Sequence, residues 1–269
     1  MLYVEKICEA SRLAKTISIV GLESFQLVEA GDNLPKLLVE TMKREEVSLN
    51  DGDIIAIAQK VVSKAEGRIV RLRDVKPSKK ALEIVKVTHK DPRHVELILR
   101  ETRKVVKASE QILIVKGRTG LVCLNAGIDK SNVEGDDAHA LLPADPDESA
   151  RRLRSEILEL TGKNVAVVIC DTFSRPFRRA QVNFAIGIAG LCPFKDYRGQ
   201  KDLFGYVIKV KRAAVADEVA AAAELAMGQG REAVPVVIIK NLNRVEWTDK
   251  SSSKDLLISK REDLFTGTL

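Results

Sequence analysis

Short apolar runs, rich in valine and isoleucine, are the feature that most limits how this chain can fold. Each run spans four to six residues. That is the length of a buried strand, and far below the ~18 apolar residues that a membrane-spanning helix needs. The predicted strands are Ile54–Ala58, Ile112–Val115, Leu121–Leu124, Val165–Cys170 and Val234–Ile239. A core of sheets is therefore expected, with no membrane as partner.

Three helices are predicted from the residues at their ends. Asp91-Pro92 and Asp145-Pro146 each place a capping carboxylate before a first-turn proline, and the second of these helices is expected to end at Gly162. The alanine-rich stretch Ala213–Met227 predicts the third. Strands and helices alternate without a regular βαβ rhythm, so we expect an α+β or mixed α/β fold, with mixed sheets and helices, over one unit of residues 1–269.

The composition is that of an ordinary folded protein, with 45% hydrophobic and 30% charged residues in a chain of 269. The first residues, MLYVEKICEASRLAK, contain no long apolar stretch, so we expect no secretory signal and a cytoplasmic location. No Cys-x-x-Cys motif occurs, which favours reduced core thiols over a zinc site or a disulfide framework. The cysteines are Cys8, Cys123, Cys170 and Cys192.

Positive charge is concentrated in one segment. The chain has 44 Lys and Arg against 38 Asp and Glu, a net charge of +6. Lys60–Lys80 alone contains eight basic and two acidic residues. Aromatic residues make up only 4%, so stacking platforms for nucleic-acid bases are scarce. A compact anion such as a nucleotide explains the segment better than nucleic acid does, although a nucleic-acid-binding protein stays an alternative.

Two segments after predicted strands carry residues suited to a phosphate or a cation. We expect Gln59–Gly67 to be a loop in which Lys60 and Lys64 hold phosphates, and a solvated basic turn is the alternative. It is not a Walker loop. The second segment, Asn125–Asn132, contains small residues that let a ligand approach the backbone. Its polar side chains, those of Asn125, Asp129, Ser131 and Asn132, supply hard oxygen ligands or amide donors. Its alternative is an ordinary turn.

Two further segments have the same ambiguity. Asp171-Thr172 ends a predicted strand, where a carboxylate is well placed for a divalent cation or merely caps a helix, and three arginines follow it. Met227–Gly230 suits either a loop whose backbone contacts a ligand or a helix C-cap. The histidines are not spaced as ligands and are expected to be structural or on the surface. Together the segments predict a metal-dependent nucleotide site without distinguishing a ligase, a kinase and a phosphatase.

The order of these motifs resembles the coenzyme F420-0:L-glutamate ligases, the gamma-glutamyl ligases of deazaflavin biosynthesis. The resemblance covers about Gly21 to Ile239, and its most specific string is Asn125-Ala126-Gly127-Ile128-Asp129-x-Ser131-Asn132. The other matching strings are Gln59–Gly67, Leu141-Leu142-Pro143-x-Asp145-Pro146, Asp171-Thr172-Phe173 and Ala216-Asp217-Glu218 followed by Met227-Gly228-Gln229.

The resemblance implies a GTP-dependent amide-forming ligase that needs Mg²⁺ or Mn²⁺ and is helped by K⁺. Such an enzyme phosphorylates the terminal carboxylate of F420-0, and the amine of L-glutamate then displaces phosphate from the acyl phosphate. A second, gamma-linked glutamate can follow. The resemblance also implies two interleaved subdomains and an intertwined homodimer, with no nucleic acid as partner.

The resemblance assigns site residues as well. The divalent cations would be held by Asp129, Asp171, Thr172 and Gln229. GTP would be held by Leu22, Glu23, Ser24, Phe25, Gln59, Lys60, Lys64, Asn132, Met227, Gly228, Gln229, Gly230, Arg231, Glu232, Ala233 and Val234. No catalytic residue is assigned, and Arg175 is a candidate.

The sequence departs from the family pattern in two places and leaves one rival enzyme class. The first loop reads Gly21-Leu22-Glu23-Ser24 instead of Gly-Leu-Pro, and Ser174 and Phe177 stand where Gly and Trp are usual. Residues 244–269 match nothing in the pattern, so the role of this tail is unknown. A metal-dependent nucleotide phosphohydrolase is the alternative within enzymes.

Overall fold

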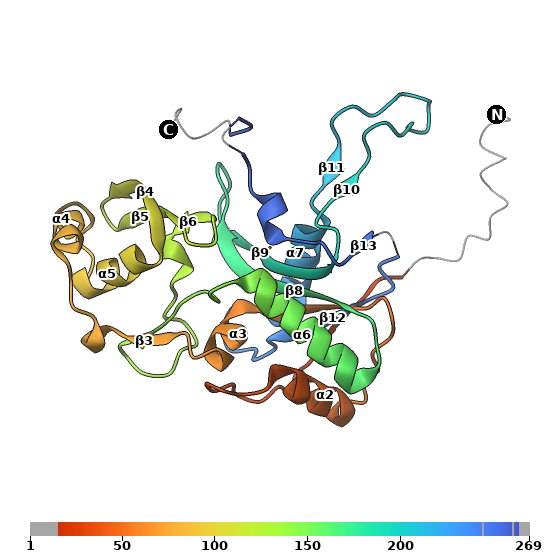
Figure 1. The fold of residues 1–269 in the computed structure, drawn as a ribbon, viewed down its shortest axis with the longest axis horizontal. Coiled ribbons are helices and arrows are strands. Elements are labelled where there is room, and N and C mark those ends of the chain that lie inside the picture. The colour runs from red at the N-terminus through yellow and green to blue at the C-terminus, as the bar shows by residue number, and fades with distance from the viewer. Residues whose placement is uncertain (1–15, 244, 260, 264–269) are drawn as a thin grey trace, which may run out of the picture.

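The computed structural model describes residues 16–243, 245–259 and 261–263. A six-stranded sheet forms its centre, in the order β1-β12-β2-β8-β9-β13 (Figure 1). β2 runs parallel to β8, and the other neighbouring pairs are antiparallel. These strands are β1 (Ser18–Gly21), β2 (Ile54–Ala58), β8 (Ala166–Ser174), β9 (Gln181–Leu191), β12 (Val236–Lys240) and β13 (Trp247–Thr248). The mixed sheet confirms the predicted class.

Helices cover both faces of this sheet. On one face pack α2 (Leu34–Arg44), α3 (Gln59–Ala65) and α6 (Pro146–Thr161), and on the other packs α7 (Val215–Met227). Successive side chains of a strand point to opposite faces, so Ile55 of β2 joins the first core and Ile54 the second. Strands buried on both faces have no polar face, which is why their sequences are apolar without alternation.

The predicted helix ends are confirmed. The Asp145 carboxylate accepts a hydrogen bond from the Glu148 amide at 3.0 Å, which caps α6. Gly162 ends this helix in the left-handed conformation, with φ of 68°. The Asp91 carboxylate accepts from the Arg93 amide at 2.8 Å and caps α5 (Pro92–Arg100). These caps satisfy backbone donors that the first turn of a helix leaves without partners.

A small lobe, residues 69–141, lies between α3 and α6 in the chain and has a third core of its own. It contains α4 (Lys79–Thr88), α5 and a three-stranded antiparallel sheet of β4 (Thr102–Ser109), β5 (Ile112–Gly117) and β6 (Val122–Leu124). The lobe begins and ends in a two-stranded ladder of β3 (Ile69–Arg71) and β7 (Ala138–Ala140). Interleaved subdomains and an intertwined homodimer stay predictions.

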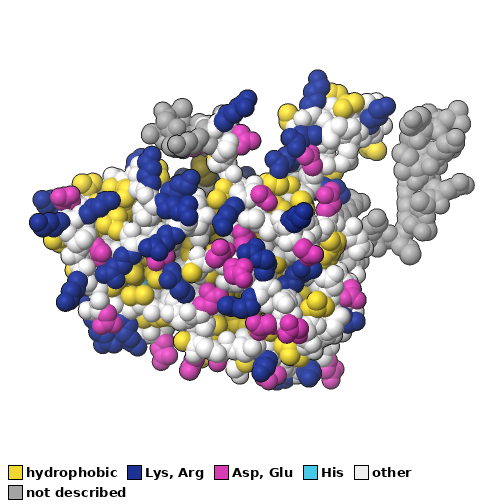
Figure 2. Space-filling view, viewed as in Figure 1, with side chains coloured by type: hydrophobic (Ala, Val, Ile, Leu, Met, Phe, Trp, Pro, Cys, Tyr) yellow, Lys and Arg dark blue, Asp and Glu magenta, His cyan; other side chains and the backbone are white. Residues whose placement is uncertain are grey.

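Lys and Arg side chains cover much of this lobe on the face seen in Figure 2. Asp and Glu lie among them, and the acidic side chains are more frequent over the remainder of that face. Some of the basic groups are paired, as in the 2.6 Å contact between Arg93 and Asp91. The local excess of positive charge is therefore partly neutralised where it occurs.

The structure corrects two predictions and adds strands that sequence reasoning missed, of which β9 is the longest. Gln59–Gly67, expected as a loop, is helix α3 followed by a single turn. The strand expected from Val234 begins at Val236. β9, with 11 residues, was not predicted because its glycines weaken the strand signal. One of them, Gly187, packs so closely on α6 that a Cβ there would lie 2.3 Å from the Pro146 carbonyl oxygen.

Two outlying segments complete the fold. An arm, residues 195–213, projects away from the sheet and has short strands β10 (Lys195–Asp196) and β11 (Arg212–Ala213) at its base (Figure 1). The described part of the C-terminal tail adds β13 to the edge of the main sheet, and its Ser253 amide donates to the Asp147 carboxylate at 2.9 Å. This tail is thus part of the fold. None of the described helices is both long and apolar enough to cross a membrane.

Candidate functional site

The parallel pair β2 and β8 positions the first two site residues. Ala58 and Cys170 are partners in the ladder, so Gln59, which begins α3, lies beside Asp171, which continues in β8 and pairs with Phe184 of β9. Burial raises the pKa of Asp171 to about 7, although the Thr172 amide, the nearby Lys60 ammonium and the Gln59 side chain all act to lower it. A half-buried carboxyl with this pKa indicates a group held for a cation or a proton.

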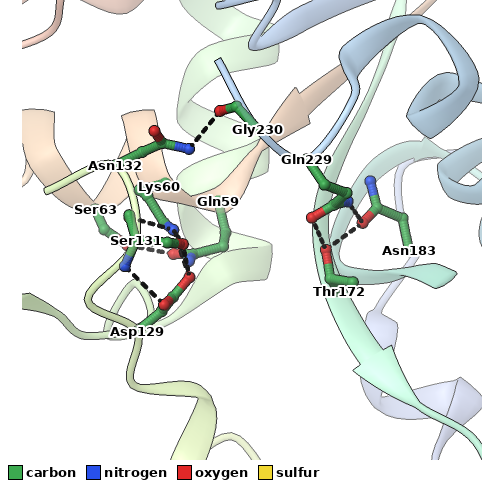
Figure 3. A network of polar contacts seen from close by, with 10 residues as sticks. All are labelled: Gln59, Lys60, Ser63, Asp129, Ser131, Asn132, Thr172, Asn183, Gln229 and Gly230. Carbon is green, nitrogen blue, oxygen red and sulfur yellow. Dashed lines mark hydrogen bonds and ion pairs between the residues drawn. The ribbon is translucent and has the colours of Figure 1, made fainter. Parts of the chain in front are cut away.

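Lys60 and Asp129 belong to one of the two groups of polar side chains at the site (Figure 3). The Lys60 ammonium donates to the Asp129 carboxylate at 2.5 Å, and also to the backbone oxygen and hydroxyl of Ser131 at 2.7 and 2.9 Å. Burial acts to raise the pKa of Asp129, but the hydrogen bonds from Lys60 and Ser131 outweigh it and hold the pKa below its usual value. Asp129 is therefore a carboxylate near neutral pH.

The backbone around Asp129 is strained. Asn125, Ala126 and Gly127 have consecutive positive φ angles of 52°, 57° and 72°. A Cβ on Gly127 would lie 2.8 Å from the Leu142 side chain, so only glycine fits there. Backbone hydrogen bonds in both directions between Asp129 and Ala140 hold the segment in place. Strain held by the surrounding fold is frequent at ligand sites.

A second group of oxygens lies on β8 and β9. Thr172 and Asn183 are partners in the ladder, and their side-chain oxygens are 2.7 Å apart. The Gln229 Oε1 atom lies 3.1 Å from the same Thr172 hydroxyl. Glu224, on α7, accepts from the Gln229 Nε2 at 2.5 Å and from the Asn183 amide at 2.8 Å. The carboxylate of Glu224 thereby turns Gln229 so that its oxygen faces Thr172 (Figure 3).

One hydrogen bond joins the two halves of the site. The Asn132 side-chain amide donates to the Gly230 carbonyl oxygen at 3.0 Å. Gly230 belongs to the loop after α7, where Gly228 has a φ of 66° and the Glu232 carboxylate accepts from the Gly230 amide at 2.7 Å. The segment of the small lobe that carries Asp129 is thus attached to the loop that carries Gln229.

The donor set fits a hard divalent cation. Among the described residues, no three or more His, Cys, Asp or Glu side chains gather as a ready-made metal cluster. The carboxylates of Asp129 and Asp171 and the neutral oxygens of Thr172 and Gln229 are the available ligands. Mg²⁺ is usually held in this way, by one or two carboxylates with substrate phosphates and water completing the shell. The Lys60 ammonium against Asp129 shows that the site accommodates a cation.

Known proteins resemble this chain over most of its length. The family model for F420-0:gamma-glutamyl ligase matches residues 23–241. The chain belongs to this family. A coenzyme F420:L-glutamate ligase of Methanothermobacter thermautotrophicus is 44% identical over 251 residues, which is 93% of this chain and 99% of that protein. Proteins of the same name from Methanocaldococcus jannaschii and Archaeoglobus fulgidus are 40% and 42% identical, over 93% and 92% of this chain and 97% and 96% of theirs.

The two loops that the F420-0:gamma-glutamyl ligase resemblance assigns to GTP contain both buried and exposed residues. Leu22 and Phe25 of the first loop have side chains in the core, and so do Met227 and Val234 at the ends of the glycine loop. Only the backbone of these residues is available to a nucleotide. The intervening residues of both loops, which include Ser24, Gly230, Arg231 and Glu232, are exposed. The assignment of GTP contacts to these loops stays a prediction.

Other expected or missed residues lie as follows. Lys64 is one helical turn beyond Lys60, and burial together with the charge of Lys60 lowers its pKa. Arg175 lies in the turn after β8, and its guanidinium donates to the Arg179 carbonyl oxygen at 3.1 Å. Sequence reasoning did not single out Asn183 or Glu224. The only signal for Glu224 was a carboxylate in the last turn of α7, five residues before Gln229.

Proposed function

We propose that this chain is a GTP-dependent ligase that adds L-glutamate to coenzyme F420-0 in coenzyme F420 biosynthesis. Its membership of the F420-0:gamma-glutamyl ligase family supports the substrate, and the names of the relatives agree. The observation that carries the proposal is the convergence of two lysines, two carboxylates and a glycine loop at one edge of the sheet. Such a set can hold a triphosphate with its cation.

The proposed reaction has two steps. A carboxylate oxygen of F420-0 attacks the γ-phosphorus of GTP, and the bond from that phosphorus to the β-phosphate oxygen breaks to release GDP. The glutamate amine then attacks the acyl carbon, loses a proton and displaces inorganic phosphate. A further, gamma-linked glutamate is added by the same chemistry. Lys60 and Lys64 bind phosphate oxygens, while the Asn132–Gly230 link holds the two sides of the site together.

Asp129, Asp171, Thr172 and Gln229 are the proposed ligands of Mg²⁺ or Mn²⁺, with K⁺ as an additional activator. The divalent ion, when bound, neutralises the triphosphate and the charge that develops during phosphoryl transfer. The chain itself keeps Asp171 partly buried within β8 and fixes the Gln229 amide through Glu224. Arg175 stays a candidate catalytic residue.

We also propose that the protein is a homodimer and that the arm contributes to the contact. The arm tip exposes large apolar side chains, with Leu203 81% and Phe204 94% exposed. An exposed apolar segment of this kind marks a contact with another molecule. A second copy is the partner that the family resemblance favours.

The test incubates the protein with GTP, L-glutamate, Mn²⁺ and F420-0. We expect GDP and a deazaflavin that is heavier by one glutamyl unit in mass spectrometry. The absence of either product contradicts the proposal. Release of GDP that needs neither L-glutamate nor F420-0 would instead support a nucleotide phosphohydrolase. Steeply salt-dependent binding to DNA or RNA would support the nucleic-acid alternative.

A further inference from the structure

The Lys60 ammonium sits where a metal ligand set would hold its ion. Three oxygens surround it at 2.5 to 2.9 Å: the Asp129 carboxylate and the carbonyl and hydroxyl oxygens of Ser131. These are hard donors of the kind that Mg²⁺ and Mn²⁺ take. The lysine side chain is only 18% exposed. The Asp129 side chain is 46% exposed, so an ion from solvent can reach this carboxylate.

Both oxygens of the Asp129 carboxylate accept hydrogen bonds. Its Oδ2 accepts from Lys60 and from the Ser131 hydroxyl at 2.6 Å, and its Oδ1 accepts from the Ser131 amide at 2.9 Å. A divalent ion bound to Oδ2 would lie beside the Lys60 ammonium. Because two cations repel strongly at contact distance, the ammonium is the donor that has to leave.

We infer that Lys60 is a resident cation of the Asp129 site, which a divalent ion displaces and which then binds the nucleotide phosphates. This inference rests on the proposed function. It makes Lys60 a positioning residue that couples metal and nucleotide. Without a nucleotide, the ion competes with the lysine. With one, the displaced ammonium gains phosphate oxygens as new partners, so each ligand favours the other to the same extent.

Long, flexible lysine side chains suit this movement. Lys60 lies in the first turn of α3, directly after β2, so its backbone is held by the sheet while its ammonium is free to turn. Lys64 follows one turn later on α3, and residues four apart lie on the same face of a helix. Burial, together with the Coulomb interaction with Lys60, lowers the pKa of Lys64. A phosphate bound there would relieve the repulsion between them.

The inference predicts opposite effects of one substitution on two ligands. Lys60→Met removes the competing cation, so we expect Mn²⁺ alone to bind about tenfold more tightly than it binds the wild type, the effect of losing a charge-assisted contact. The same change removes a phosphate contact, so GDP in the presence of Mn²⁺ should bind about tenfold more weakly. Lys60→Gln, which keeps a donor for Asp129 without the charge, is expected to act in the same direction and serves as a second variant.

The experiment titrates Mn²⁺ into EDTA-stripped protein and measures free Mn²⁺ by electron paramagnetic resonance, without and with GDP. The matched control is Lys130→Met, because Lys130 neighbours Asp129 in the sequence and is exposed. It removes the same charge without removing the contact. We expect its Mn²⁺ affinity to stay near that of the wild type. Thermal melts verify that each variant is folded.

Two results would overturn the inference separately from the proposed function. In the first, the wild type binds Mn²⁺ and GDP together, but neither Lys60 variant binds Mn²⁺ alone more tightly than the wild type. Lys60 then does not compete with the ion. If Lys130→Met tightens Mn²⁺ binding as much as Lys60→Met, only net charge matters. If the wild type binds Mn²⁺ neither with nor without GDP, the proposed metal and nucleotide site is wrong, and this inference with it.

Discussion

The side chain of Asn132 donates a hydrogen bond to the Gly230 carbonyl oxygen at 3.0 Å, across 98 residues of sequence. This contact joins the lobe segment that carries Asp129 to the loop that carries Gln229. The two segments come from different parts of the fold, and each provides proposed ligands. A link between them keeps those ligands at a fixed separation before any substrate binds.

Asn132→Asp is expected to raise the KM for GTP about tenfold. The substituted carboxylate cannot donate to the Gly230 carbonyl oxygen, and the loss of a hydrogen bond together with repulsion between the two oxygens costs roughly 1.5 kcal/mol. Asn132 is exposed, so the melting temperature should change little. Steady-state kinetics and a thermal melt measure the two effects. An unchanged KM would mean that this link has no part in binding GTP.

Glu224→Gln is expected to lower activity by 10- to 100-fold, because residues that orient metal ligands have effects of that size. Both oxygens of Glu224 accept hydrogen bonds, from Gln229 and from the Asn183 amide. The new side-chain amide would place its own N–H groups against either the Gln229 Nε2 or the Asn183 backbone N–H, which are both donors. Gln229 would then turn away. Glu218→Gln is the matched control, since Glu218 is exposed on the same helix.

The measurement for Glu224 is the activity as a function of Mn²⁺ concentration. A role in positioning Gln229 predicts that half-maximal activity needs more Mn²⁺ in Glu224→Gln and not in Glu218→Gln. If both variants retain wild-type activity and Mn²⁺ dependence, the assignment of Gln229 as a ligand loses its support.

Much of the fold could be predicted from local sequence signals, and the reason is physical. Strands buried on both faces must be apolar throughout, and β2 was predicted with its actual bounds, Ile54–Ala58. The proline and aspartate at the start of α6 act within one turn, so they are visible in the sequence. β9 was missed because its glycines serve tertiary packing against α6, which no local pattern reveals.

The candidate site was predictable in its charged residues and not in its supporting residues. Asp129, Asp171 and Lys60 follow predicted strands or lie in a motif that resembles a known family, so position and residue type single them out. Glu224 acts through Gln229, and Asn183 faces Thr172 only because β8 and β9 pair in one register. Such roles depend on contacts between distant segments. The sequence contains no period or spacing that encodes them.

The arm provides a prediction about the assembly. The double substitution Leu203→Glu with Phe204→Glu should convert the proposed dimer into a monomer, because charges are placed on the most exposed apolar part of the arm. Stability of the single chain should not suffer, since both side chains are exposed. Light scattering after gel filtration measures the mass. A wild-type mass of one chain would contradict the proposed dimer itself.

Asp171→Asn provides the sharpest test, because it separates function from stability. Burial raises the pKa of this carboxyl to about 7, above the ordinary value of 3.8. The folded protein therefore binds a proton more tightly than the unfolded chain does. The resulting stabilisation is complete below about pH 3.8 and is lost as the pH rises through 7. At pH 8 the metal-free wild type keeps a charged carboxylate at a cost on the order of 4 kcal/mol.

The amide of asparagine has almost the same shape and no charge to bury. We therefore expect Asp171→Asn to melt at a higher temperature than the wild type at pH 8 in EDTA, with a smaller difference at pH 5. Ligase turnover with Mn²⁺ should fall nearly to zero, because a hard cation loses a negatively charged ligand. Asp129→Asn should also abolish turnover, but without the gain in stability, because Asp129 is paired with Lys60. Near-normal turnover in both variants would show that the two carboxylates are structural.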